Sequence, residues 1–573
     1  MPLLHAFPLF AAALVAQTPA APAPEAGSTA AATPPAAPAI APIPGLSWSL
    51  IAKEPLVQDP VSFCIADDGS IYVAESFRQE KGVEDNRSSK FWLEDDLQLQ
   101  TVQDRLKMYE KWVAKRAGGM DYYRKEEDRV THLVDTNGDG VPDKMSSFSG
   151  PINEPLDGTG AGVMYLDGSV WYTCIPNLWR FQDTKGTGVA DVREKVFTGF
   201  GVRTALRGHD MHGVAAGPDG RIYWSIGDRG YNVTNKEGKN LKRVFTGAVF
   251  RCEPDGSRLE VFAHSLRNPQ ELAFNQWGDL FTGDNNSDGG DRARIVYIME
   301  GGETGWDMNY QTLEGSNQRG PWNQERSWWK WDTADTMRPA WNLPPIEHLS
   351  DGPAGMTFYP GLGLPDRYKN HFFLCDFLGG DEYSQILSFA VEPEGAGYKV
   401  TDAHEFVKEV LPTDVDFGWD GRMYISDWSN GWESDRTGQM FTLWDPSKVE
   451  DVNIRTAQNL VREGFAKQAD SLLFQSMAHP DVRIRQRAHL ELARRGAKVT
   501  EPLAKTAADA GQPIEPRFHA LWALGVQSRR AADAGKRLAK ADEAVVAHLS
   551  DEDAEMRRLA ARLAGEARID SAG

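Results

Sequence analysis

The chain has 573 residues, more than one domain usually holds. Its formal net charge is −20 at pH 7, from Lys+Arg 62 against Asp+Glu 82, which argues against a nucleic-acid-binding protein with a basic surface. Hydrophobic residues make up 41% of the sequence, enough for a sizeable core, and Gly 54 with Pro 33 favours turn-rich β structure.

The N-terminal segment predicts export. Residues 1–16 form a short apolar stretch, too short to span a membrane and of the length of a signal-peptide core, although no Lys or Arg precedes it. Residues 17–45 are rich in Ala and Pro and predict an extended linker. We therefore expect an exported protein, periplasmic or at the cell surface, whose linker ends either at a cleavage site or at an anchor.

One sequence pattern recurs six times between residues 46 and 448. Each copy has a short apolar strand, a turn that contains Gly, and a second apolar strand. The copies begin at Val61, Gly160, His212, Gln270, Gly355 and Asp414. Six hairpins at this spacing predict a mainly β fold, a six-bladed β-propeller, with a β-sandwich as the alternative.

Two other segments predict helices. Residues 78–129, between the first two hairpins, contain a stretch of strong helix formers at helical spacing, and we expect this insertion to shape the mouth of the propeller. Residues 449–573 are rich in Ala, Arg, Leu and Glu and predict a C-terminal α-helical domain of HEAT-like repeats, which bind a protein partner or stiffen the chain.

The four cysteines exclude some cofactors. Cys64, Cys174, Cys252 and Cys375 lie far apart, and the sequence contains no CxxC or CxxCH motif, so it predicts no haem and no thiolate zinc site in this chain. We expect four buried thiols, with one or two disulfides as the alternative for an exported protein.

The densest group of candidate catalytic residues lies around the third hairpin. His209 and His212 precede its first predicted strand, and Asp228 follows its second. A His at the mouth of a propeller can take a proton from a substrate hydroxyl, and a carboxylate can orient it. Alternatively, the His is bonded to the backbone of a loop. Arg267 and Asn268 precede the fourth hairpin, where an Arg can hold an acceptor.

The stretches GHDMHGVAAGPDGRIYWSIGDRG and LRNPQELAF resemble soluble pyrroloquinoline-quinone-dependent sugar dehydrogenases. The resemblance implies a six-bladed propeller that binds the quinone and calcium over its channel. It further implies that His209 is the catalytic base, that Asp228 is its partner, and that Arg267 and Asn268 contact the quinone.

The sequence departs from that family at the quinone-gripping cations. The family's basic residues would lie near Leu378 and Gly379, and near Leu411 and Thr413, but none of these positions is Lys or Arg here. A tricarboxylate without its cations is costly to desolvate.

A second resemblance extends over nearly the whole chain. LEDDLQLQTVQDRLKMYEKW, DNNSDGGDRARIVYIMEGGETGW and DGPAGMTFYPGLGLPDRYKNHFFLCDFLGG are similar to the membrane-bound dehydrogenase family of planctomycetes and verrucomicrobia. Those proteins join a propeller to HEAT repeats and usually to a C-terminal cytochrome c. Since this chain lacks the cytochrome, the resemblance implies a separate electron acceptor.

The segment DTNGDGVPD has the spacing of a calcium loop. Asp135, Asn137, Asp139, Val141 and Asp143 occupy ligand positions one, three, five, seven and nine. The closing Glu at position twelve is absent, so the alternative is a plain Asn-Gly hairpin turn. The related segment 183–191 has Lys185 in a ligand position, and we expect it to bind no metal.

Together these patterns predict an exported dehydrogenase of sugars or alcohols with a quinone-type cofactor, calcium and His209 as general base. One alternative is a calcium-dependent hydrolase or lactonase on a propeller. Another is a non-catalytic module that binds carbohydrate or protein. The tryptophans between Trp306 and Trp341 either stack on sugar rings or pack in the core.

Overall fold

The structure is a computed structural model and describes residues 43–286, 292–306, 308 and 345–570. The predicted signal peptide 1–16 and the linker up to residue 42 lie outside the described residues. So do all the tryptophans of the Trp306–Trp341 stretch except Trp306 itself. Among the described helices, none has the length and apolar character needed to cross a membrane.

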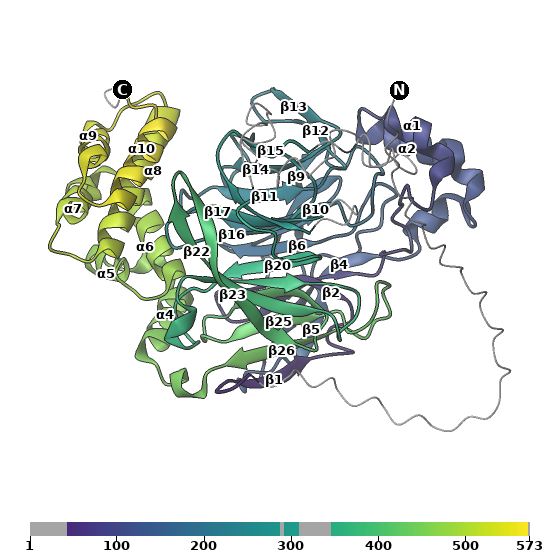
Figure 1. The fold of residues 1–573 in the computed structure, drawn as a ribbon, viewed down its shortest axis with the longest axis horizontal. Helices are drawn as coiled ribbons and strands as arrows, with labels where there is room; N and C mark the ends of the chain where they lie inside the picture. The colour runs from purple at the N-terminus through teal and green to yellow at the C-terminus, as the bar shows by residue number, and fades with distance from the viewer. Residues whose placement is uncertain (1–42, 287–291, 307, 309–344, 571–573) are drawn as a thin grey trace, which may run out of the picture. The chain divides into compact units, whose positions relative to one another are not determined.

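Blades one to three of the propeller follow the first three predicted hairpins (Figure 1). Blade one contains β2 (Pro60–Ile65), β3 (Ile71–Ser76), β4 (Asp128–Val134) and β5 (Lys144–Ser147). Blade two contains β6 (Gly162–Leu166), β7 (Ser169–Cys174), β8 (Asn177–Gln182) and β9 (Val192–Thr198). Blade three contains β10 (Met211–Ala216), β11 (Ile222–Ile226), β14 (Gly247–Cys252), β15 (Glu260–Leu266) and the short β19 (Gly302–Glu303). A separate hairpin, β12 (Tyr231–Thr234) and β13 (Asn240–Arg243), extends from this blade.

Blades four to six complete the ring. Blade four contains β16 (Pro269–Phe274), β17 (Leu280–Asp284) and β18 (Arg294–Ile298). Blade five contains β20 (Pro353–Phe358), β21 (His371–Asp376), β22 (Gln385–Glu394) and β23 (Gly397–Lys408). Blade six contains β24 (Pro412–Phe417), β25 (Met423–Asp427), β26 (Gln439–Trp444) and β1 (Ser47–Ala52).

The ring closes in two ways. The N-terminal strand β1 pairs antiparallel with β26, so both ends of the propeller sequence share one blade. The innermost strands β2, β6, β10, β16, β20 and β24 each contact the innermost strands of both neighbouring blades. The predicted six-bladed β-propeller is therefore confirmed.

Aromatic and small apolar side chains fill the space between blades. Trp224 stacks on Phe250 within blade three and on Phe197 of blade two, with interplanar angles of 12° and 19°. The four cysteines are buried and unpaired, as their spacing predicts. Fully buried aromatic residues at strand interiors are among the most effective sources of hydrophobic stabilisation.

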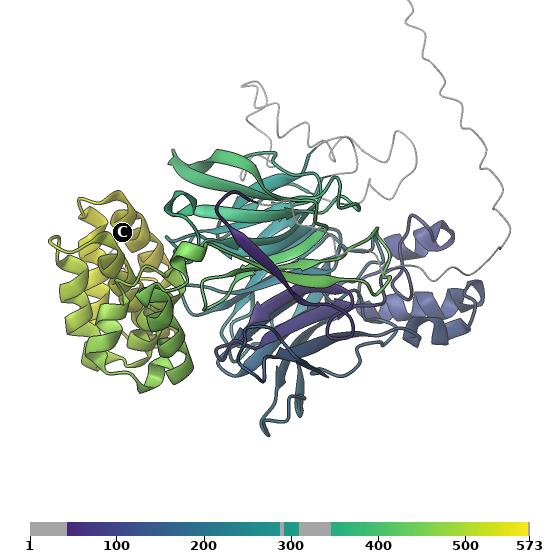
Figure 2. The ribbon, with the colours of Figure 1, turned by 90° about the horizontal axis from the view of Figure 1, so that it is seen from below.

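The helical insertion contains η1 (Lys90–Trp92), α1 (Leu93–Leu97), α2 (Val102–Trp112), η2 (Val113–Lys115) and η3 (Gly119–Arg124). Thr101 caps α2 through a reciprocal capping box with Asp104. A buried ion pair of 2.8 Å between Asp96 and Arg203 ties the insertion to the loop before blade three. Figures 1 and 2 show α1 and α2 on the opposite side of the strands from the C-terminal helices.

The C-terminal region is α-helical, as predicted. Its helices are α4 (Val452–Glu463), α5 (Asp470–Ser476), α6 (Val482–Arg494), α7 (Ala497–Ala508), α8 (Ile514–Asp533), α9 (Ala539–Ala547) and α10 (Ala554–Glu566), with short 3₁₀ turns η9 (Pro446–Lys448), η10 (Phe465–Lys467) and η11 (His548–Ser550). The most buried of them, α8, lies at the centre, where Trp522 and its apolar neighbours join α6, α7 and α10 in one hydrophobic cluster. A helix that is apolar on most of its surface is stable only when it is surrounded in this way.

The C-terminal helices contact all six blades at one end of the channel. In every blade the contact falls at the last residue of the innermost strand or in the turn that follows it. Blades one and two make ion pairs, Asp67 with Arg487 at 2.7 Å and Asp167 with Arg494 at 2.8 Å. In the other four blades a backbone oxygen accepts a hydrogen bond from a helix residue. These bonds are Gln486 to Ala216, Arg562 to Gly278, the Val482 N–H to Pro360, and Arg483 to Gly418. The innermost strands therefore all run toward the helices, and the helices cover that end of the channel.

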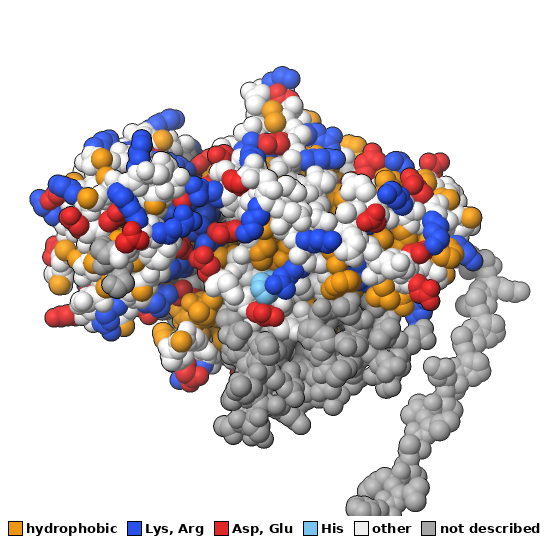
Figure 3. Space-filling view, turned by 90° about the horizontal axis from the view of Figure 1, so that it is seen from above, with side chains coloured by type: hydrophobic (Ala, Val, Ile, Leu, Met, Phe, Trp, Pro, Cys, Tyr) orange, Lys and Arg blue, Asp and Glu red, His pale blue; other side chains and the backbone are white. Residues whose placement is uncertain are grey.

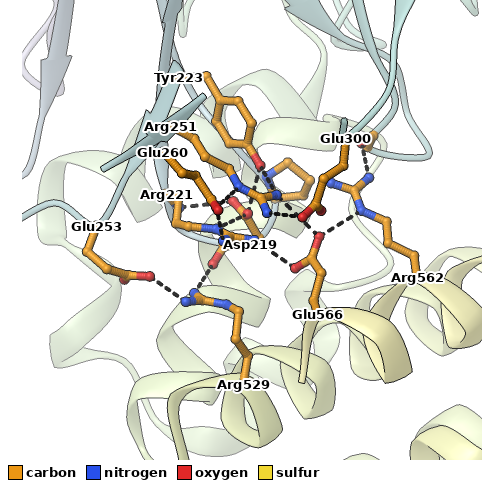
Figure 4. Close-up of polar contacts among 12 residues, drawn as sticks. Asp219, Arg221, Tyr223, Arg251, Glu253, Glu260, Glu300, Arg529, Arg562 and Glu566 are labelled. Atoms are coloured by element: carbon orange, nitrogen blue, oxygen red, sulfur yellow. Dashed lines mark hydrogen bonds and ion pairs between the residues drawn. The ribbon is translucent and has the colours of Figure 1, made fainter. Parts of the chain in front are cut away.

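A buried network of charges joins blade three to α8 and α10 (Figure 4). Arg221 bonds Asp219 at 2.5 Å within the blade and Glu566 of α10 at 2.8 Å. Arg529 of α8 donates to the backbone oxygen of Asp219 at 3.1 Å. Although burial alone would raise their pKa values, the surrounding arginines hold the pKa of Asp219 and of Glu566 below the ordinary range. Figure 3 shows Lys and Arg side chains gathered along this boundary.

Candidate active site

The opposite end of the channel, as far as the described residues form it, is not covered by helices and holds a cavity of about 870 Å³. Each of the six innermost strands contributes residues at or just before its first positions. Blades one to three contribute Val61 and Ser62, Thr159 and Ala161, and His209 and His212. Blades four to six contribute Asn268, Gln270 and Glu271, then Pro353, Ala354 and Gly355, and finally Thr413. The volume lies in the range of small-molecule sites.

His209 and Asp228 form a hydrogen-bonded pair at the wall of this cavity. His209 Nδ1 lies 2.7 Å from Asp228 Oδ1. His209 lines the cavity, whereas Asp228 is fully buried behind it. A carboxylate on Nδ1 favours the tautomer that leaves Nε2 as the proton acceptor.

The carboxylate of Asp228 is held from its other side by a tryptophan. Trp306 donates from Nε1 to Asp228 Oδ2 at 2.9 Å, and the guanidinium of Arg267 lies over the Trp306 ring at 5.4 Å. Burial alone would raise the pKa of Asp228, but His209, Arg267 and the Trp306 hydrogen bond together lower it. Asp228 is thus kept ionised and fixed in position.

Trp306 is a site residue that sequence reasoning misses. It lies in a loop after β19 and 78 residues beyond Asp228, and its backbone N–H donates to Ser265 at 2.8 Å. Its place in a Trp-rich stretch suggests stacking on sugar or core packing, but no local pattern predicts a hydrogen bond to a carboxylate.

The structure separates Arg267 from Asn268. Asn268 lines the cavity, and its side chain donates to Gly208 O at 3.1 Å and accepts from His212 Nε2 at 3.0 Å. Arg267 is fully buried and does not belong to the described lining. Gly227 permits this arrangement, because a Cβ there would lie 2.6 Å from both His209 O and Asn268 Oδ1.

His212 differs from its neighbour His209 although both line the cavity. Its Nε2 lies near two acceptors, Gly208 O at 2.9 Å and Asn268 Oδ1, so this nitrogen carries the proton. Burial lowers the pKa of His212 to about 4. His212 is a neutral residue whose Nε2 positions Asn268.

Two carboxylates near the channel axis were not predicted. Glu271 of β16 lines the cavity, and Asp414 of β24 accepts from the Phe63 N–H at 2.9 Å. Gly213 and Gly355 on adjacent strands make room, since a Cβ on either would lie within 2.4 Å of one of these carboxylates. Burial raises the pKa of both groups, and their mutual repulsion raises that of Glu271 further.

The predicted calcium loop lies at the other end of blade one, between β4 and β5. Asp135 accepts N–H bonds from Gly138 and Gly140, both at 2.7 Å, while Asn137 and Asp139 accept from the N–H groups two residues on. Asp143 accepts from Thr136. Val141 is exposed. Within the described residues no three His, Cys, Asp or Glu side chains lie close enough together to hold a metal.

Sequence comparison identifies the family. The family model described as "Domain of unknown function (DUF7133)" matches residues 36–432. The chain belongs to this family. The aldose sugar dehydrogenase YliI of Escherichia coli (strain K12) is 26% identical over 228 residues, which cover 37% of this chain and 55% of that protein. The similarity thus spans about half the length of this curated relative.

Solved structures similar to this chain include two dehydrogenases and a lyase. The PQQ-bound form of aldose sugar dehydrogenase from Streptomyces coelicolor has a TM-score of 0.39 and 14% identity, covering 70% of this chain and 100% of that one. The holo form of the pyranose dehydrogenase PQQ domain from Coprinopsis cinerea has a TM-score of 0.40 and 11% identity, covering 71% and 97%. Virginiamycin B lyase from Staphylococcus aureus has a TM-score of 0.30 and 11% identity, covering 70% and 98%.

Proposed function

We propose that this protein is an oxidoreductase that dehydrogenates a hydroxyl group of a sugar or alcohol, with His209 as the general base. The observation that carries the proposal is the pair of His209 and Asp228 at the wall of the cavity, with Nδ1 occupied and Nε2 left for substrate. The similarity to an aldose sugar dehydrogenase supports a carbohydrate substrate.

The proposed reaction balances at one carbon atom. His209 Nε2 takes the hydroxyl proton, the C–H bond breaks with its electron pair leaving as hydride to a two-electron acceptor, and a carbonyl forms. Asp228 stabilises the imidazolium that results, and Trp306 keeps the carboxylate in place. A positioned base of this kind contributes about 10²–10⁴-fold to the rate.

The described lining does not fit a free tricarboxylate quinone. Two arginines line the cavity, but Arg207 contacts Glu80, and Arg87 pairs with Asp85 at 2.7 Å. Leu378 and Thr413, at positions where the resembling family has cations, line the cavity without charge. Glu271 and Asp351 add further acidic groups. We therefore do not assign pyrroloquinoline quinone to this cavity. We propose instead a quinone-type acceptor that carries fewer negative charges than this tricarboxylate.

Dye-linked oxidation tests the proposal. Purified protein is given a panel of aldoses and alcohols with an electron-accepting dye, with and without added calcium and pyrroloquinoline quinone. We expect dye reduction that falls at least about 100-fold in His209→Ala. His404→Ala, which changes a histidine on the outer strand β23, is the matched control and should keep full activity. Absence of dye reduction by folded protein under every addition would refute the dehydrogenase.

The same pair of His209 and Asp228 favours one second candidate, a hydrolase or lactonase on this propeller. Among the described residues the cavity offers no group of three His, Cys, Asp or Glu side chains for a metal, so this candidate is given no divalent cation there. In that reaction His209 would activate water, and the two-electron acceptor would be unnecessary. Hydrolysis of a lactone by protein that reduces no dye would establish this alternative.

We further propose that the protein is exported to the periplasm or cell surface and that it passes electrons to a separate acceptor. We also propose that its helical region binds a protein partner. The faces of α6 and α10 that contact the propeller are occupied. A partner would therefore meet the other helices, such as α7 and α9. A cleavage assay of the exported protein, with the mature N-terminus read by mass spectrometry, tests the signal peptide at residues 1–16.

A further inference from the structure

The cavity has a second wall on the far side from His209. His209 precedes β10 of blade three, whereas Trp428 and Trp432 lie between β25 and β26 of blade six, and all three line the cavity. Blades three and six are three places apart in a ring of six, so they face each other across the axis. A single sugar ring placed against His209 would fill only part of a cavity of about 870 Å³.

Trp432 presents an open aromatic surface to the cavity. Its side chain is 58% exposed, which is unusual for a tryptophan. One side of the indole is supported, because Phe377 packs edge-on at 5.0 Å and a Cβ on Gly379 would lie 2.1 Å from Trp432 Nε1. The ring is therefore held in place while much of its surface faces solvent. Such a platform suits the C–H face of a sugar ring.

Trp428 belongs to the same wall but is buried. It is 5% exposed, and its Nε1 has neither a hydrogen-bond partner nor accessible surface among the described residues. Its backbone N–H donates to Leu411 O at 2.9 Å, and Ser429, the next residue, has a φ of +72°. The start of the loop that carries Trp432 is therefore fixed in position.

We propose that Trp432 forms a subsite for a second sugar ring, so that the substrate is a disaccharide or longer oligosaccharide. One ring stacks on Trp432, while the ring that reacts lies against His209. This inference rests on the proposed function for the reaction at His209, but the subsite itself is defined by binding.

Titration calorimetry with glucose, maltose, cellobiose and maltotriose tests the subsite without using turnover. We expect the wild-type protein to bind at least one disaccharide about tenfold more tightly than glucose, a gain of one contact-rich ring. Trp432→Ala should abolish this gain, and Trp432→Phe should keep part of it. Tyr383→Ala is the matched control, since Tyr383 is 67% exposed and does not line the cavity.

The results separate the subsite from the reaction. His209→Ala should keep the preference for disaccharides while losing dye reduction, which supports both proposals. If affinity rises with the length of the oligosaccharide and this rise requires Trp432, the subsite is supported. If the same protein reduces no dye, the dehydrogenase is refuted. Equal affinity for glucose and all the oligosaccharides, no binding of any of them, or a preference that survives Trp432→Ala would overturn the subsite.

Discussion

The two ends of the propeller channel are built from the same six strands, but one end is packed against helices and the other lines a cavity. At the helical end, the turns after the innermost strands are covered, and charges such as Arg221 and Glu566 are paired and buried. At the open end, the first residues of those strands line a cavity, and His209 lines it with the buried carboxylate of Asp228 behind it. Paired and covered charges indicate a structural role, and a base beside a cavity indicates a ligand.

This contrast teaches which substitutions should affect stability and which should affect chemistry. The helical end contains fixed partners whose loss leaves buried charges unpaired. Backbone conformations with positive φ occur at both ends, at Glu80, Ala205 and Ser429 near the open end and at Asp167 and Arg258 near the helical end, so backbone strain does not distinguish the two ends. A substitution at one end should therefore leave the property that depends on the other end largely unchanged.

The largest effect should come from Arg221→Ala at the helical end. Removing this guanidinium leaves Asp219 and Glu566 buried without one of their partners, which we expect to cost about 3–5 kcal/mol of the free energy of unfolding. Urea denaturation followed by circular dichroism measures it. Arg455→Ala, in the exposed pair with Glu450, is the control and should cost less than about 1 kcal/mol. If both variants lowered the free energy of unfolding equally, the buried network would not stabilise the contact between blade three and the helices.

At the open end, Asp228→Asn should lower kcat by about 10²–10³-fold and change stability much less than Arg221→Ala does. The amide can still contact His209 Nδ1 but no longer favours the tautomer with Nε2 free or stabilises the imidazolium. Steady-state dye reduction and urea denaturation of the same variant give both quantities. A variant with full activity would exclude the role proposed for the pair.

The sequence predicts more of the fold than of the site. Six hairpins with Gly-containing turns are local patterns, so the propeller follows from them. The pairing of His209 with Asp228 could also be predicted, because both flank one hairpin. Contacts between distant segments could not, such as Trp306 with Asp228 or Glu271 near Asp414. The burial of Arg267 likewise depends on how blades three and four pack, which its position before a strand does not reveal.

The helical region shows the same limit. The amphipathic pattern of α6 predicts a helix with one apolar face. It does not predict that the polar residues Gln486, Arg487 and Arg494 contact three different blades. The HEAT-like assignment and the membrane-bound dehydrogenase resemblance stay predictions.

A smaller and pH-dependent effect should come from two histidines at the helical end. Arg485 Nε donates to His519 Nε2 at 3.1 Å, so His519 Nδ1 carries the proton directed to His489 Nδ1 at 2.8 Å. His489 Nε2 then donates to Pro218 O at 2.7 Å. Burial lowers the pKa of His489 to about 4 and holds the pKa of His519 well below its ordinary value. The chain of bonds needs both rings neutral.

The folded state disfavours protonation of these rings, whereas the unfolded chain takes up a proton near pH ~6.5. The free energy of unfolding is therefore highest above pH ~6.5 and falls as the pH drops toward about 4. For His489 this loss amounts to up to about 3 kcal/mol. The groups facing the pair are Arg485 and Asp219, and the arginines around Asp219 keep it ionised over this range. His489→Gln cannot titrate, so its free energy of unfolding should vary less between pH 6.5 and 4. Identical pH profiles for variant and wild type would exclude this origin.

The smallest expected effect concerns the two related loops at the helical end of blades one and two. Both are closed by the same contacts, since Thr136 bonds Asp143 and Thr184 bonds Asp191. The first loop has oxygen ligands at alternating positions, whereas the second has Lys185 in one of them. We expect millimolar calcium to raise the melting temperature of the wild type slightly, Asp139→Ala to abolish that rise, and Asp183→Ala to preserve it. A calcium response retained in Asp139→Ala would place the cation elsewhere. No response in the wild type would mean that internal N–H bonds alone hold this loop, as they hold its relative.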